Sequence, residues 1–408
     1  MSEILFLAHR VPFPPNRGDR IRSAHLLTKL ASLAPVHVGC FAESDEDRAG
    51  GEEVKALAAS HRIVNRTKPL VLAGLEAVLS GKPVSLTAFH SARLQSWVQK
   101  TIAYRPITTI FVFSGQMGQY IPADFSGKVI VDLCDVDSAK FEGYAAAGQR
   151  VWLNSREGRL LSFEEERLAH RADATILISN NEAQLFSSRL NDSSNVNVRI
   201  LGNGIDCEVF DPDQTEPHPV LSSRSGPHFV FTGQMDYPPN EQAALWAIQS
   251  WWPVYQRDNP AAELHIVGRN PTEALMARGK VPGVTIWGEV PDVCPFIAAA
   301  DCIVVPLAIA RGVQNKVLEA MAMAKPVVLT PEAATGIDAI DGTHWLHCMA
   351  DPEAFTAKIN ALTTDPGKAR TLGDAARQFV IDHHDWAAML APLDGFVNAQ
   401  GEEARDAA

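Results

Sequence analysis

The stretch that decides the fold reads ADCIVVPLAIARGVQNKVLEAMAMAKPVV and covers residues 300–328. The apolar run Cys302–Pro306 predicts a buried strand, and apolar residues at helical spacing over Val313–Met323 predict a helix. A second apolar run, Pro326–Leu329, predicts the next strand. Because a strand, a loop, a helix and a strand in this order form the repeating unit of a parallel sheet, the stretch indicates an α/β fold.

The same alternation runs along both halves of the chain, so we expect two doubly wound, Rossmann-like domains. Open sheets of this kind bind ligands beyond the carboxyl ends of their strands, and two such edges facing each other across a cleft suit an enzyme with two substrates. A segment rich in Pro and Ser, without periodicity, predicts a linker between them. The expected organisation is a first domain over 1–206, the linker over 207–227, a second domain over 228–380, a helix over 381–398 that returns to the first domain with Trp386 as its anchor, and a disordered tail over 399–408.

Composition excludes several classes of protein. The 408 residues are 46% hydrophobic and 21% charged, which is ordinary for a globular chain. No run of 18 apolar residues exists, so no transmembrane helix is expected, and the first residues predict a buried strand instead of a signal peptide. The six cysteines lack metal-ligand spacing. This argues against a zinc site or a disulfide framework and for a reducing, cytoplasmic compartment.

Charge is distributed unevenly. The net charge is −12, yet residues 1–206 hold 23 Lys and Arg against 22 Asp and Glu, and the remainder holds 13 against 26. An acidic chain argues against nucleic acid as a partner. The segment His61–Ala123 is locally basic, with seven basic residues and one acidic residue. Together with Leu79, Phe89 and Trp97 it predicts contact with anionic lipid on the inner face of a membrane; the alternative is a solvated helix surface.

The helix within the opening stretch predicts a phosphate site. Backbone N–H groups at a helix N-terminus bind anions, and Lys316 in the first turn adds positive charge. Glu319, one turn later, offers a carboxylate to the two hydroxyls of a ribose. The alternative is that Lys316 and Glu319 form only an i,i+3 ion pair at the surface.

Two loops of the first half carry further candidates for chemistry. The phrase HRVPFPPNRGDRIR, residues 9–22, places Arg17, Arg20 and Arg22 around the start of a predicted helix, which favours an anion site. It contains no GxGxxG dinucleotide fingerprint. The phrase VDLCDVDSAK, residues 131–140, follows a predicted strand and supplies Asp135 and Asp137 as candidate general bases.

Alternative roles exist for these groups. Asp135 and Asp137 also suit a cluster of helix N-caps. They are formally a DxD pair, which keeps a metal-dependent reaction as an alternative, and His9 is another polar group near the reaction.

Three phrases of the second half complete the pattern. LGNGIDCEVFDP (201–212) suits a tight turn between domains. FTGQMDYPPN (231–240) follows a strand and places Asn240 at a helix N-cap, and WGEVPDV (287–293) follows the end of another strand. Arg269, after another strand, offers a second cation.

Taken together, these phrases resemble the family 4 glycosyltransferases, and most closely the sugar transferases associated with bacterial exopolysaccharide and exosortase systems. The resemblance covers nearly the whole chain and includes the AMA and PVV elements that follow Glu319. The chain departs from the family pattern at Arg311, where the family has a glutamate that contacts the sugar, and at Cys134, where many relatives have a histidine.

The resemblance implies the GT-B fold and transfer of a sugar from a UDP- or GDP-sugar to a glycan or lipid-linked acceptor, with retention of configuration and without metal or cofactor. It assigns catalysis to Asp135, Asp137 and His9, and the acceptor side to Arg17 and Arg22. The donor-binding residues that it implies are Gly18, Arg20, Gly233, Asp236, Tyr237, Asn240, Arg269, Gly288, Val290, Arg311, Gly312, Val313, Asn315, Lys316 and Glu319.

Three other classes compete with this interpretation. A nucleotide-sugar epimerase of the same fold would bind similar donors and convert them without an acceptor. An NAD-dependent oxidoreductase also has doubly wound domains, although the glycine fingerprint is missing. A non-catalytic protein that binds nucleotide-sugars would be consistent with the departures at Arg311 and Cys134.

Overall fold

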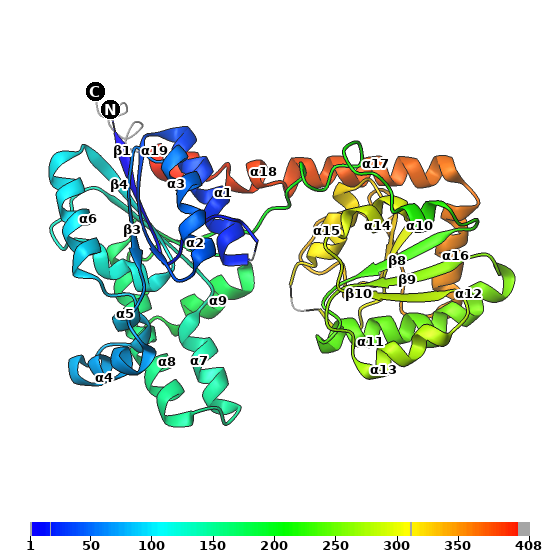
Figure 1. Cartoon of the computed structure of the whole chain (residues 1–408), viewed down its shortest axis with the longest axis horizontal. Helices are drawn as coiled ribbons and strands as arrows, with labels where there is room; N and C mark the ends of the chain where they lie inside the picture. Colours follow the sequence, from blue (N-terminus) through cyan, green and yellow to red (C-terminus); the bar gives the residue numbers. More distant parts are fainter. Residues whose placement is uncertain (1, 17, 311, 399–408) are drawn as a thin grey trace. The chain divides into compact units, whose positions relative to one another are not determined.

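The computed structural model describes residues 2–16, 18–310 and 312–398 of the chain. These residues fold into two compact units, each built on its own sheet (Figure 1). The first unit comprises Met1–Asn203 together with Met389–Ala408, and the second comprises Gly204–Ala388. The chain therefore enters the second unit inside the Asn-Gly-Ile-Asp phrase, and the segment predicted as a linker belongs to that unit.

The first unit contains a seven-stranded parallel sheet in the order β3-β2-β1-β4-β5-β6-β7. Its central strands β1, β4 and β5 are buried along nearly their whole length, because helices cover both faces of a parallel sheet. The order reverses between β1 and β4, where Ala8 pairs with Phe113 and the two strands end together. His9 leaves the sheet at this switch point. The strands are β1 (Glu3–Ala8), β2 (Val36–Ala42), β3 (Ser60–Asn65), β4 (Ile107–Phe113), β5 (Lys128–Cys134), β6 (Ala174–Leu177) and β7 (Val198–Ile200).

Helices surround this sheet and also extend past the ends of its strands. Figure 1 shows α4, α5, α7 and α8 gathered at the end of the unit opposite the N-terminus of β1. The described helices are α1 (Gly18–Leu33), α2 (Asp45–Ala49), α3 (Gly51–Leu57), α4 (Leu70–Ser80), α5 (Val84–Ala88), α6 (Ala92–Tyr104), the 3₁₀ helix η1 (Gly115–Tyr120), α7 (Asp137–Ala146), α8 (Val151–Arg171), α9 (Asn180–Arg189) and α19 (Leu393–Asn398).

The second unit contains a six-stranded parallel sheet in the order β10-β9-β8-β11-β12-β13. Its order reverses between β8 and β11. Aromatic side chains fill one side of the core, where Trp251 and Tyr255 pack edge-on against Phe229 of β8. The strands are β8 (His228–Thr232), β9 (Glu263–Val267), β10 (Val284–Gly288), β11 (Cys302–Val305), β12 (Val327–Leu329) and β13 (Leu346–His347).

The helices of the second unit include the one predicted from the opening stretch, which begins two residues later than expected. The segment predicted as an unstructured linker contains the short helix α10. The described helices are α10 (Pro219–Ser222), α11 (Pro238–Trp246), the π-helical turn η2 (Ala247–Trp251), α12 (Trp252–Asp258), α13 (Glu273–Met276), the 3₁₀ helix η3 (Ala277–Lys280), α14 (Cys294–Ala299), α15 (Asn315–Ala322), α16 (Pro352–Thr363) and α17 (Pro366–His383).

The end of the chain corrects one prediction. Instead of one helix over 381–398, α17 ends at His383, and α18 (Trp386–Leu390) and α19 follow as separate short helices. Trp386, the predicted anchor, lies in the second unit, where its backbone packs against Gly204. The return to the first unit is made instead by the buried Leu393 and by Asp394, which lies 2.7 Å from Lys29 Nζ. The tail predicted over 399–408 lies outside the described residues.

Among residues 2–16, 18–310 and 312–398, no helix combines the length and the apolarity that a membrane span requires.

Candidate functional site

A cleft of about 540 Å³ opens in the second unit where β8 and β9 end and α15 begins. This is the carboxyl edge of the sheet, next to its switch point, which is the expected position for a ligand. Seven of the residues predicted to bind a donor line the cleft: Gly233, Asn240, Arg269, Val290, Asn315, Lys316 and Glu319. Six further lining residues were not predicted, although all lie at or near strand ends: Thr232, Gln234, Val267, Gly268, Glu289 and Val293.

Lys316 is the buried cation of this cleft, with only 9% of its surface exposed. Its Nζ donates a hydrogen bond to Asn240 Oδ1 at 2.6 Å and lies 5.4 Å from the centre of the Phe231 ring. Burial lowers the pKa of Lys316 to about 8, and the negative charge of Glu319 opposes this shift. The side chain thus points into the cleft, and the alternative of a surface ion pair with Glu319 is wrong.

Asn240 positions this lysine, and the prediction of a helix cap there is wrong. Helix α11 begins at Pro238 with Tyr237 as its N-cap, so Asn240 lies inside the first turn. Its amide group accepts from Lys316 through Oδ1 and donates to the carbonyl of Gln234 through Nδ2 at 3.0 Å. Both ends of the Asn240 amide are therefore used to fix the position of the Lys316 side chain.

Glu319 lies one helical turn beyond Lys316, on the same side of α15. Burial raises the pKa of its carboxyl to about 7, and Lys316 opposes the shift. A half-buried carboxyl group at the wall of a cleft is well placed to exchange hydrogen bonds with a ligand's hydroxyl groups. The geometry agrees with a role in ligand binding.

The N-terminus of α15 contributes backbone donors. Its N-cap, Gln314, makes no side-chain hydrogen bond to the first turn, because its amide donates to the Gly312 carbonyl at 2.9 Å. The N–H groups at the start of the helix are consequently not capped by that side chain. Uncapped N–H groups and the positive end of the helix dipole favour an anion at this position.

Two glycines form the floor of the cleft and account for its shape. A Cβ on Gly268 would lie 1.6 Å from the carbonyl oxygen of Gly233. A Cβ on Gly233 would lie 2.9 Å from Asn240 Nδ2 and 3.3 Å from Lys316 Cε. The loops after β8 and β9 therefore touch through their backbones, and side chains at either position would displace the Lys316–Asn240 pair.

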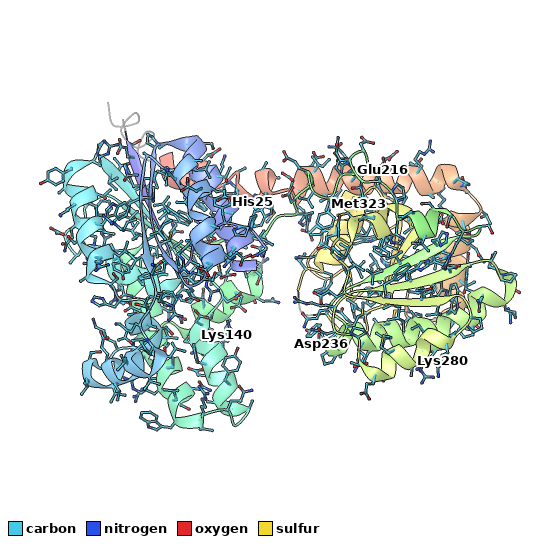
Figure 2. The ribbon with its side chains drawn as sticks, viewed as in Figure 1. His25, Lys140, Glu216, Asp236, Lys280 and Met323 are labelled. Atoms are coloured by element: carbon cyan, nitrogen blue, oxygen red, sulfur yellow. The ribbon has the colours of Figure 1, made fainter. Side chains whose placement is uncertain are left out.

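Other predicted donor residues lie near the cleft without lining it. Asp236 accepts from Asn270 at 3.2 Å and Tyr237 is exposed, both on the loop after β8; Asp236 lies at the end of the unit where β8 and β9 terminate (Figure 2). Gly288 has a φ of +72° and accepts from the N–H of Gly268 at 2.9 Å, which explains why glycine stands there. Gly312 and Val313 belong to the loop before α15, and Arg311 lies outside the described residues.

In the first unit, the carboxyl edge of the sheet presents His9. Its ring stacks on Phe113 at 5.7 Å between centroids, and its Nε2 lies 3.4 Å from an Asp19 carboxylate oxygen. Hydrogen bonding to His9 and the charge of Arg10 hold the pKa of Asp19 well below its usual range. The buried Nδ1 of His9 has no hydrogen-bond partner among the described residues. The ring is thus held by Asp19 on one side and has an unused polar atom on the other.

The two candidate bases follow β5 at the same edge. Asp135 is exposed, and Asp137 is the first residue of α7 with its carboxylate 3.6 Å from Lys140 Nζ. Burial, assisted by Asp135, raises the pKa of Asp137. Neither aspartate caps the helix, because the N-cap is Val136 and makes no side-chain cap. Cys134 has a φ of +63°, and burial keeps its thiol protonated by raising its pKa well above the usual value.

Two predicted ligand-binding arginines are structural, which corrects those assignments. Arg20 is buried and paired with the buried Asp47. Arg22 is buried and donates to Asp132 at 2.9 Å, to Asn203 Oδ1 and to the carbonyl oxygens of Leu201 and Gly202. With these bonds formed, neither guanidinium is available to a phosphate. Gly18 opens α1 with space around it, and Arg17 lies outside the described residues.

One cluster in the second unit has the composition of a metal site. His228, Glu263 and His265 bring their ligand atoms within 4.8 Å of one another at the amino ends of β8 and β9. The Trp287 indole N–H donates to His265 Nδ1 at 3.2 Å, so His265 Nε2 carries the proton and donates to His228 Nδ1 at 3.1 Å. A ligating histidine would donate through its second nitrogen instead of accepting. We assign this cluster to packing in the core.

The three apolar residues predicted to face lipid in the basic segment differ in their exposure. Leu79 is 88% exposed. Phe89 and Trp97 are half-buried, since Phe89 packs on Phe41 and His9 within the unit and Trp97 packs near Gly39. Leu79 is therefore the most exposed of the three.

Residues 226–365 match the family model of the glycosyl transferases group 1. The matched segment contains the cleft, from β8 through α15 to α16. No curated protein sequence shows significant similarity to the chain.

Solved structures show that the complete two-unit α/β fold with parallel sheets is GT-B. Sucrose-phosphate synthase from Thermosynechococcus elongatus is 18% identical, with a TM-score of 0.58, covering 100% of this chain and 99% of its own. A glycosyltransferase from Rickettsia africae is 15% identical, with a TM-score of 0.61 and coverage of 98% and 99%. HepE from Anabaena, solved with UDP, is 16% identical, with a TM-score of 0.58 and full coverage of both chains.

Proposed function

We propose that the chain is a glycosyltransferase that moves a sugar from a nucleotide-sugar to a glycan or lipid-linked acceptor. The observation that carries this proposal is the cleft of the second unit, where Lys316 is held by Asn240 at 2.6 Å beside an uncapped helix N-terminus. The group 1 family match over residues 226–365 supports the same activity.

In this proposal the leaving diphosphate binds at the start of α15. The backbone N–H groups of the first turn and the Lys316 ammonium stabilise the negative charge that develops as the sugar–phosphate bond breaks. These donors come from protein groups alone, so we propose that the reaction needs no metal. Arg269, which lines the cleft and donates to Gln234 Oε1 at 2.8 Å, supplies a second positive charge.

Glu319 is assigned to the ribose. A carboxylate accepts hydrogen bonds from two adjacent hydroxyl groups, and its position one turn from Lys316 suits a ribose next to the diphosphate. The loop of Glu289 and Val290 lines the same cleft and is assigned to the base. HepE has been solved with UDP and with UDP-glucose, so UDP-sugars are the first donors to test, followed by GDP-sugars.

The acceptor is assigned to the first unit, where Asp135, Asp137 and His9 stand at the carboxyl edge of the sheet. A carboxylate there would accept the proton of the attacking hydroxyl group. The finer parts of the proposal are a retaining reaction and a place in exopolysaccharide assembly in the cytoplasm. They rest on the resemblance of the sequence phrases.

The test is calorimetric titration of the whole chain with UDP, GDP and their sugar derivatives in the presence of a chelator. We expect one nucleotide-sugar to bind, and the Lys316→Met and Glu319→Gln variants to lose roughly tenfold or more in affinity. Lys280→Met and Glu353→Gln are matched controls, because both residues are exposed and lie outside the cleft. Lys280 is labelled in Figure 2.

Transfer is then measured with a labelled donor and cell-envelope glycolipid as acceptor. Asp137→Asn should lower transfer while donor affinity is unchanged. Conversion of the donor sugar to its epimer without acceptor would contradict the proposal, and so would donor affinity that is equal in Glu319→Gln and in wild type.

A further inference from the structure

Helix α4 exposes its large apolar side chains and buries small ones, which is the opposite of an ordinary helix in a soluble protein. Only two of its residues, Ala73 and Ala77, are fully buried, both at 0% exposure. Its six large aliphatic residues all face outward at 55% exposure or more: Leu70, Val71, Leu72, Leu75, Val78 and Leu79. We call these six residues the α4 patch. A soluble helix normally buries its large apolar side chains, so the patch requires an explanation outside the core of the unit.

A second element extends the patch. Val151 and Trp152, at the start of α8, are exposed at 53% and 69%. One turn later, Arg156 donates to the carbonyl oxygens of Ala77 at 2.7 Å and Lys82 at 3.1 Å, which ties α8 to the end of α4. Trp152 and Arg156 are neighbours on α8, so the indole lies close to the end of the α4 patch. Tryptophan is the residue that most favours the interface between lipid and water.

The charges around the patch are positive. The acidic groups nearby are already satisfied within the unit: Glu76 is paired with Lys68 at 2.7 Å, and Glu157 accepts from the backbone N–H groups of Val84 and Ser85. Lys82, Arg150 and Arg159 are exposed beside the two apolar stretches. An apolar surface with a net positive border is complementary to a membrane that carries anionic lipid.

Two features of the described residues favour lipid over a second copy of the chain as the occupant of the α4 patch. A helix–helix interface with a second copy would favour a patch without a charged border, since like charges would then meet across the symmetry axis. The patch also lies at the same end of the first unit as the candidate acceptor residues. Phe89 directly follows α5, the helix after α4, and the centroid of its ring lies 5.9 Å from that of His9.

We infer that the α4 patch, with Val151 and Trp152, docks the chain on an anionic lipid surface, where α4 lies parallel to the membrane. Such docking would hold the acceptor residues of the first unit next to the lipid surface. The inference rests on the exposed helix alone, so it stands whether or not the donor cleft has the activity proposed above.

The test is co-sedimentation of the whole chain with vesicles of phosphatidylcholine, with and without phosphatidylglycerol. We expect binding to the anionic vesicles, weakened by salt, and weak binding to the neutral ones. The Leu75→Ser/Leu79→Ser variant should bind the anionic vesicles at least roughly tenfold more weakly, because both side chains enter the lipid. Lys82→Glu/Arg150→Glu should lose most of the dependence on phosphatidylglycerol.

Tyr104→Ser is the matched control, since Tyr104 is an exposed apolar residue of the same unit, at the far end of α6. It should bind vesicles like wild type, and circular dichroism should show that all variants are folded. Wild type that does not sediment with anionic vesicles, or that sediments equally with Leu75→Ser/Leu79→Ser, overturns the inference. A dimer in light scattering that only Leu75→Ser/Leu79→Ser abolishes, without vesicle binding, assigns the patch to a second copy instead.

Discussion

Asn240 accepts a 2.6 Å hydrogen bond from Lys316, and this contact joins the first turn of α11 to the first turn of α15. It lies over a floor in which Gly233 and Gly268 meet backbone to backbone. The position of the ammonium group is consequently set before any ligand arrives, which lowers the cost of ordering the site on binding.

Donor binding should therefore depend on pH through Lys316. Its pKa is lowered to about 8, so the ammonium is charged below that pH and neutral above it. Affinity for a nucleoside diphosphate is expected to fall as pH rises through about 8, approaching tenfold per pH unit. Lys316→Arg should bind without this dependence, because a guanidinium stays protonated. Calorimetric titration from neutral to alkaline pH measures both, and a flat wild-type profile would contradict the prediction.

Glu319 should make the free energy of unfolding depend on pH, in a lower pH range than the one in which Lys316 affects donor affinity. In the folded protein its pKa is raised from 4.5 to about 7. The contribution of Glu319 to the free energy of unfolding is therefore fully present below pH 4.5 and is lost as the pH rises through about 7. Relative to Glu319→Gln, wild type should lose about 1–3 kcal/mol of unfolding free energy over this range. Urea unfolding at several pH values measures the difference. The exposed Glu353→Gln serves as control and should show none.

Gly268→Ala should destabilise the second unit strongly. Its Cβ would stand 1.6 Å from the Gly233 carbonyl oxygen, so the two loops must separate. We expect a loss of about 3 kcal/mol or more, together with weaker nucleotide binding. Gly279→Ala, whose nearest neighbour would be 3.8 Å away, should change stability by less than about 0.5 kcal/mol. Equal stability of the two variants in urea would show that the loops do not require this contact.

The buried pair of Arg22 and Asp132 predicts a result in the first unit. Arg22→Met leaves the Asp132 carboxylate at 0% exposure without its cation, which should cost about 3–5 kcal/mol. Arg22→Met/Asp132→Leu should recover part of that loss, because no unpaired charge then remains. Unfolding followed by circular dichroism compares the two variants. If the double variant were the less stable one, Arg22 would stabilise the unit mainly through its hydrogen bonds to carbonyl oxygens.

The outline of the fold was predictable where local pattern decides it. Apolar runs located β1, β8 and β11, and helical spacing located α15. The three helices between β3 and β4 were not predicted, because α4 carries its large apolar residues on the outside and so lacks the usual pattern of a buried face. The break between α17 and α18 also escaped, since the periodicity of the residues continues through it.

The residues of the candidate site were likewise predictable only where the local sequence fixes their position. Lys316 and Glu319 were identified because they share one helix, where spacing fixes their relation. Arg20 and Arg22 were misassigned because the partners that neutralise them, Asp47 and Asp132, lie 27 and 110 residues away in the chain. Asn240 was associated with the donor through its place at a helix start, whereas its contact to Lys316 spans 76 residues and is visible only in three dimensions.

On α4, the alanines that pack against the unit and the six residues that face outward are under different selective constraints. Folding of the first unit requires only that Ala73 and Ala77 stay small enough for the helix to sit close. The six outward positions contribute little to that packing, so mutations there are free to accumulate unless the outer surface has its own use. Large aliphatic residues at all six positions are costly for solubility, and a chain released from any surface should replace them with charged residues within the same helix. Variation at these positions would thus report on the surroundings in which the protein works and carry almost no information about its fold.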